Sequence, residues 1–156
     1  MIWWVLLAVI VTAVLLWAYF TAQRLNRLHI RTDSALQNLQ AALDLRASLV
    51  EALIPELTAA ARSAAALPLV HNGFDQRAAR ERHLVEALTH RVGTASALPP
   101  QLIDATARVE LAHRFYNDAV TTTRALRTRP LVRFFRLGGT APLPDYFELS
   151  QVEMSE

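Results

Sequence analysis

The sequence contains no cysteine and no lysine, and only four of its 156 residues are glycine. Without cysteine, the chain forms no disulfide bond and offers no thiolate for metal binding or for nucleophilic catalysis. All 16 basic residues are arginine, and the net charge is only +2. Because nucleic-acid binders carry a strong basic excess, this balance argues against a nucleic-acid partner.

Strand signals are also missing. Long stretches rich in alanine, leucine, arginine and glutamate are separated by the four glycines and seven prolines, and no alternating apolar and polar pattern lies between them. Stretches of this kind favour helices, whereas strands show alternation or β-branched runs. The sequence therefore predicts an all-α fold.

Charge is absent from the first 22 residues. From Ile2 to Phe20 every residue is apolar except Thr12, and aromatic residues lie at both ends of the run. About 20 apolar residues at 1.5 Å each cross the roughly 30 Å hydrocarbon core, and aromatic rings favour its two interfaces. Residues 1–22 are therefore predicted to be a transmembrane anchor. A cleaved signal peptide, the alternative, would need a basic start and a shorter apolar core.

Arginines at positions 24, 27 and 31 follow the anchor before the first acidic residue, Asp33. Arginine beside a membrane span tends to stay on the cytoplasmic side. We therefore expect a single-pass protein with its N-terminus outside and the bulk of the chain in the cytoplasm.

Helical periodicity continues beyond the anchor. We expect the first helix to run on to about residue 67, with a bend at Pro55, although a true break is the alternative. A second helix is expected over 76–97 with Asp75 as its N-cap, and a third over 101–129. A short helix follows over 131–137. Residues 23–137 are thus predicted to form an elongated antiparallel helical bundle, with an irregular tail over 138–156.

Apolar lines on the second and third helices predict which faces are buried. The line on the second helix is Ala78, Val85, Leu88, Val92 and Ala95. The line on the third is Leu102, Ala105, Val109, Ala112, Tyr116, Ala119, Thr123 and Leu126.

The membrane-proximal part of the first helix carries an apolar stripe of Leu25, Leu28, Leu36 and Leu39. Because the second helix is only about half as long as the first beyond the membrane, it cannot cover this stripe. Either the C-terminal tail doubles back over it, or another protein does. An apolar stripe without an internal partner is typical of an interaction surface, so we assign these leucines to partner binding.

Two short motifs point to a family. Residues 112–120 read Ala-His-Arg-Phe-Tyr-Asn-Asp-Ala-Val, and Tyr-Phe-Glu follows at 146–148. They resemble the A-R-x-x-Y-N-D-A-V and closing Y-F-E segments of the bacterial LemA family, with His113 in place of the usual arginine. Residues 33–50 resemble further family segments, although Glu51 stands where the family has proline. The positions carrying the resemblance include Arg46, Tyr116, Asn117, Asp118, Tyr146, Phe147 and Glu148.

The resemblance implies an elongated LemA-like bundle held to the bacterial cytoplasmic membrane by one helix, with no established enzyme chemistry. Some short LemA-like proteins resemble accessory subunits of membrane complexes, including the bacterial cytochrome bc–cytochrome oxidase supercomplex. Other integral membrane subunits are therefore the partners that the resemblance suggests.

Metal-binding patterns are weak. Glu110 and His113 have the Glu-x-x-His spacing of di-iron bundles, but such sites need a second copy and further inward glutamates. His83, Glu86 and His90 share one face of the second helix, as solvated residues commonly do. Serines are scattered without a nucleophile elbow, and no phosphate-binding motif occurs. We expect no cofactor and no enzymatic activity.

An arginine-rich segment without acidic residues lies between Asp118 and Asp145. Its residues Arg129, Arg133, Phe134 and Arg136 are assigned to partner binding, through an acidic patch on another protein. The simpler interpretation has solvated arginines and phenylalanines folded against the end of the bundle. A membrane-surface role is disfavoured if the third helix points away from the bilayer.

Two core positions carry polar groups. Arg46 lies on the apolar seam of the first helix, and a buried guanidinium must be paired, so we expect a carboxylate from Asp104 or Glu110. Tyr116 is expected inside the bundle with its hydroxyl bonded, while Asn117 and Asp118 satisfy neighbouring polar groups.

These observations predict an accessory or scaffolding subunit of a membrane protein complex. A self-assembling membrane scaffold is the alternative, and a metal-binding enzyme is a third hypothesis.

Overall fold

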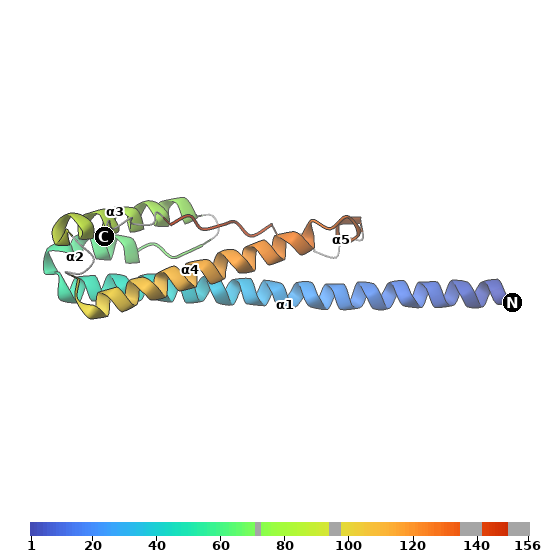
Figure 1. Ribbon diagram of the computed structural model, residues 1–156. Coiled ribbons are helices and arrows are strands. Elements are labelled where there is room, and N and C mark those ends of the chain that lie inside the picture. The colour runs from blue at the N-terminus through green and yellow to red at the C-terminus, as the bar shows by residue number, and fades with distance from the viewer. Residues whose placement is uncertain (71–72, 94–97, 135–141, 150–156) are drawn as a thin grey trace.

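The computed structural model describes residues 1–70, 73–93, 98–134 and 142–149. Its helices are α1 (Ile2–Leu53), the 3-10 helix η1 (Pro55–Leu57), α2 (Thr58–Ala65), α3 (Phe74–Val92), α4 (Pro100–Arg127) and α5 (Pro130–Phe134). The described ranges contain no strand, so the predicted all-α class is confirmed. The N-terminal end of α1 extends alone, and the other helices lie along the rest of it (Figure 1).

α1 is a single helix of 52 residues that contains both the apolar run and the first part of the bundle. The large apolar side chains between Ile2 and Phe20 are exposed, and this part of α1 is long and apolar enough to cross a membrane. The first buried residue along the helix is Leu25. The expected continuity between the apolar run and the bundle is therefore confirmed.

Pro55 breaks the first helix, so the expected bend and the expected end near residue 67 are wrong. Ile54 leaves helical geometry at φ −132° and ψ 80°, because proline disfavours the α conformation of the residue before it. The chain then turns back, and Arg62 on α2 donates to the Glu51 carboxylate at 2.6 Å. In one continuous helix their backbones would be about 16 Å apart along the axis. α2 therefore packs against the end of α1 as a hairpin.

α3 begins and ends at glycines. Its N-cap is Gly73 rather than the expected Asp75, which lies in the first turn, where a carboxylate interacts favourably with the helix dipole. The helix ends at Val92, earlier than expected, and Gly93 follows at φ 79°. Glycine adopts this positive φ without the steric clash that a Cβ atom would cause, and the helix stops there.

The buried face of α3 differs from the expected one. The buried residues are Phe74, Arg77, Glu81 and Leu84. Along the expected line, Ala78, Val85, Leu88 and Val92 are only partly buried, and Ala95 lies outside the described residues. The difference arises because two charged residues pair inside the bundle, which a search for apolar periodicity does not detect.

α4 runs antiparallel to α1 and returns toward the apolar run. At its start, Leu102 packs in one cluster with Val50 and Ile54, and near its end Leu126 packs with Leu25. The predicted buried line is confirmed, with Ala112 partly rather than fully buried. α4 thus points toward the apolar run, so the condition under which a membrane-surface role is disfavoured is not met.

The C-terminal tail doubles back, as one of the two expected covers for α1. Residues 142–149 form neither helix nor strand and run along α4 toward α3 (Figure 1). Phe147 is fully buried in a cluster with Leu39, Phe74 and Tyr116. The tail therefore covers the end of the stripe near Leu39, while α4 and α5 cover the end near Leu25.

The leucine stripe of α1 is consequently not a free partner surface, and that assignment is wrong. Leu25 and Leu39 are 2% and 0% exposed, and Leu28 and Leu36 pack partly buried against the same clusters. The reason is the length of α4, whose 28 residues extend about 42 Å and cover the stripe that α3 cannot reach.

Candidate partner-binding groove

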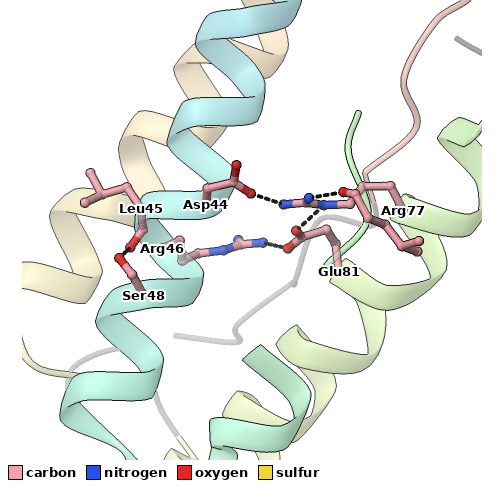
Figure 2. Close-up of polar contacts among 7 residues, drawn as sticks. Asp44, Leu45, Arg46, Ser48, Arg77 and Glu81 are labelled. Atoms are coloured by element: carbon pink, nitrogen blue, oxygen red, sulfur yellow. Dashed lines mark hydrogen bonds and ion pairs between the residues drawn. The ribbon is translucent and has the colours of Figure 1, made fainter. Parts of the chain in front are cut away.

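A buried ion-pair network joins α1 to α3 and fixes the frame of the bundle (Figure 2). Arg46 donates to one oxygen of the Glu81 carboxylate at 2.7 Å, and Arg77 donates to the other at 2.8 Å. Arg77 also donates to Asp44 at 2.8 Å and to the backbone carbonyl of Leu67. Two guanidinium and two carboxylate groups thus balance in charge.

Three side chains of the network are shielded from solvent, and the fourth, Asp44, is partly exposed to it. The Arg77 and Glu81 side chains are fully buried, Arg46 is 5% exposed, and Asp44 is 41% exposed. Such pairs often stabilise a protein no more than apolar residues of the same volume would, but removing one partner leaves a charge unpaired in a low dielectric. The Arg46 Nε atom is buried without a hydrogen-bond partner among the described residues. The network therefore specifies how α3 docks.

The expectation for Arg46 is half correct. Arg46 is buried and paired, but its partner is Glu81 and not Asp104 or Glu110. Asp104 instead pairs with Arg108 on its own helix, and Glu110 is exposed. Sequence reasoning missed Arg77 and Glu81 because an Arg-x-x-x-Glu pair is usual on solvated helix surfaces.

The two family-like motifs hold the tail onto α4. Asn117 accepts from the Phe147 backbone N–H at 3.2 Å, and its amide donates to the Phe147 carbonyl at 3.3 Å. The His113 ring nitrogen lies 2.6 Å from the same carbonyl. Phe147 itself meets Phe74 edge-on, with ring centroids 5.4 Å apart. These groups therefore act as a clasp, and the structure places them in a structural role.

The other motif residues are more exposed. Asp118 lies 3.6 Å from Arg31 across the two helices, and both are solvent-exposed. The Tyr146 ring lies 5.1 Å from the guanidinium carbon of Arg124 and its hydroxyl is 3.2 Å from that of Thr121. Glu148 is exposed. These contacts lie beside the clasp and orient the tail.

Tyr116 is fully buried and donates its hydroxyl to the Asp145 carbonyl at 2.7 Å, as expected for an inward tyrosine. Burial, with a smaller effect of the nearby Asp145 charge, raises the pKa of Tyr116 from 10.0 to about 12. The neutral phenol is thus favoured in the folded chain.

We predict an alkaline loss of stability from Tyr116. Its contribution is fully present below pH 10.0 and is lost as the pH rises to about 12, because only the folded state still holds the proton in that window. Stability measured by chemical denaturation across this range should fall for the native chain and fall less for Tyr116→Phe. The control Tyr146→Phe should retain the full decline. An identical decline in Tyr116→Phe would contradict the assignment.

A groove lies between α1 and α4. Its volume is about 340 Å³, and it is lined by Arg31, Ser34, Ala35 and Asn38 from α1 and by Arg108, Leu111, Ala112 and Phe115 from α4. Leu111 and Phe115 are 52% and 58% exposed. At 100° per residue, these two α4 positions lie on the flank opposite to His113 and Asn117, which hold the tail. The described part of the tail, residues 142–149, therefore does not line the groove.

The groove has the chemistry of a docking site. Two small residues, Ala35 and Ala112, form part of its lining, and two large apolar side chains stand beside them with arginines at either side. Concave apolar surfaces with a polar rim receive helices or extended segments of partner proteins. No nucleophile paired with a base lines it.

Arg129, Arg133 and Phe134 lie in or beside α5 with exposed side chains, so the expectation that Phe134 folds against the bundle is wrong. Arg136 lies outside the described residues. Among the described residues, no group of three or more His, Asp or Glu side chains is arranged to hold a metal ion.

Comparisons of the chain with protein-family models, with curated proteins and with solved structures found no match. The resemblance to the LemA family therefore stays a prediction from the motif residues.

Proposed function

We propose that this chain is a non-enzymatic, membrane-anchored subunit that binds another integral membrane protein through the groove between α1 and α4. The observation that carries the proposal is that two exposed apolar surfaces lie along α1, one formed by α1 itself and one that α1 and α4 line together. The first is the run from Ile2 to Phe20, which suits the lipid bilayer, and the second is the groove beside Ala35.

Distance favours a membrane partner. Ala35 lies 15 positions beyond Phe20 on the same helix, which places the groove about 22 Å above the last apolar residue of the run. A protein that rises from the same bilayer reaches this height with a short helix or loop. A groove so close to an anchor is thus presented to neighbours in the membrane plane.

The orientation follows from charge. Exposed Arg24 and Arg27 flank the apolar run on the side of the bundle. Positive residues next to a span favour the cytoplasmic side, so we propose an outside N-terminus and a cytoplasmic bundle in a bacterial cytoplasmic membrane. A respiratory supercomplex is the first complex to examine, on the LemA resemblance alone.

Co-purification with a groove variant tests this proposal. The full chain, extracted in mild detergent and crosslinked, is expected to bring down an integral membrane protein in fixed stoichiometry. Phe115→Asp should reduce that yield at least several-fold, because a charge in the apolar groove must be desolvated on docking. Ile103→Asp is the matched control, since Ile103 is 46% exposed on the same helix and does not line the groove.

Three results would count against it. If Phe115→Asp recovered the partner at the native yield, the groove would not be the binding site. Recovery of only a second copy of the chain would instead favour a self-assembling scaffold. A chain that washes from membranes with alkaline carbonate would contradict the anchor itself.

A further inference from the structure

α5 lies at the end of the bundle next to the apolar run. If that run spans a bilayer, α5 faces the bilayer surface. Leu126 of α4 and Val132 of α5 are 6% and 3% exposed and pack on Leu25 of α1. About two turns beyond Leu25 along α1, the hydroxyls of Thr32 and Thr123 lie 3.0 Å apart. α5 is thereby fixed at the height of Leu25, and Figure 1 shows it at the N-terminal end of the bundle.

That height matches the headgroup layer of a bilayer. Leu25 lies five positions beyond Phe20 in a continuous helix, about 7–8 Å along the axis. The polar layer on each side of the hydrocarbon core is about 5–8 Å thick. With the apolar run in the bilayer, α5 lies level with the lipid phosphates.

The exposed side chains of this end combine apolar and basic groups. Val132 is the buried residue of α5, while Leu131 and Phe134 are 57% and 79% exposed. Arg129 and Arg133 are exposed beside them, and Arg24 and Arg27 are exposed on the adjacent part of α1.

The stretch of sequence that contains α5 carries no acidic residue. The sequence has no acidic residue between Asp118 and Asp145 or before Asp33. Asp118 and Asp145 are themselves paired with Arg31 and Arg124. Arginines with neighbouring aromatic and aliphatic side chains are typical of segments that lie in the interface of an anionic membrane.

We infer that α5 is a second membrane contact, with Leu131 and Phe134 at the lipid interface and Arg129 and Arg133 binding the phosphates of anionic phospholipids. The inference rests on the proposed membrane anchor. Two attachments, one at each of two helices, fix the tilt of the bundle, whereas a single span leaves it free to rotate. The contact thus presents the groove in a defined direction to neighbouring membrane proteins.

Nitroxide labels test this inference cleanly, because the chain contains no native cysteine. The full chain is reconstituted in vesicles of phosphatidylcholine with phosphatidylglycerol, with one label at a time. Leu15→Cys reports on the apolar run, Phe134→Cys on α5, and Ala59→Cys on the exposed surface of α2 at the far end of the bundle. Collision with oxygen reports lipid, and collision with a polar nickel chelate reports water.

The label at 134 is expected to show several-fold less collision with the nickel chelate than the label at 59. Each basic residue near an anionic surface strengthens attachment about fivefold, so Arg129→Gln with Arg133→Gln should restore much of the collision at 134. Vesicles of phosphatidylcholine alone should give the same restoration.

The three labels separate the possible failures. A label at 15 that is shielded, with a label at 134 as accessible as that at 59, would overturn the α5 contact and leave the anchor intact. The phosphate contact would be overturned if the label at 134 were shielded equally well in vesicles without anionic lipid and in the variant without the two arginines. A label at 15 that collides freely with the nickel chelate would overturn the anchor, and with it this inference.

Discussion

Replacing Glu81 by glutamine is expected to lower the free energy of unfolding by about 3–5 kcal/mol, the range for breaking a buried ion pair by removing one partner. Glu81 is fully buried and is the carboxylate that Arg46 and Arg77 share. Glutamine keeps the shape and one acceptor oxygen but leaves two desolvated guanidinium groups with only the half-exposed Asp44 to balance them. α3 should therefore lose its fixed position against α1.

Thermal or denaturant unfolding of the full chain in detergent micelles, followed by circular dichroism, measures this effect. The matched control is Glu86→Gln on the same helix, where the side chain is exposed. Surface substitutions of this kind change stability by about 0.5 kcal/mol or less. Equal stabilities of the two variants would show that the buried network does not hold α3.

Truncating Phe147 to alanine is the second large effect, with an expected loss of about 3–5 kcal/mol. The Phe147 side chain is fully buried, and its ring meets those of Phe74 and His113 edge-on. Without it, a cavity would open between the tail, α3 and α4, and the backbone bonds to Asn117 would lose their support. The tail should then detach before the helices unfold.

Limited proteolysis combined with denaturant unfolding resolves the two stages. Phe147→Ala should be cut within the tail much faster than the native chain. Leu143→Ala is the control, because Leu143 is in the same segment but is 41% exposed. Tail cleavage at the native rate in Phe147→Ala would contradict the clasp.

The parts of the fold that follow from apolar periodicity were predictable from the sequence. α4 is the clearest case, since its buried residues repeat at helical spacing from Leu102 to Leu126 and Pro100 marks its start. The long uninterrupted α1 follows from its composition in the same way. These elements bury apolar side chains on one face, which is the signal that periodicity reads.

Other parts depend on contacts between distant residues and gave no such signal. α3 buries Arg77 and Glu81, and their burial depends on the facing Arg46 and Asp44 of α1, which pair with them. Pro55 was visible, but whether the chain bends or reverses there depends on α2 finding a surface on α1. The cover of the leucine stripe depends on the direction of α4, which helix lengths alone do not determine.

The candidate site was missed for a related reason. Leu111 and Phe115 lie outside the apolar line of their helix, and exposed apolar residues are common on protein surfaces. They gain meaning only when α1 brings Ala35 and Arg31 beside them to form a groove. By contrast, Arg129, Arg133 and Phe134 were singled out from the sequence, and the direction of α4 changes the proposed partner from an acidic protein to a lipid surface.

Photocrosslinking in living cells from position 115 tests the central claim most directly. A benzophenone amino acid replaces Phe115 in one variant and Ile103 in the control. We predict one dominant product from position 115, joining the chain to an integral membrane protein, and no such product from position 103. The absence of a product from position 115, the same products from both positions, or a product that contains only a second copy of the chain would contradict the account.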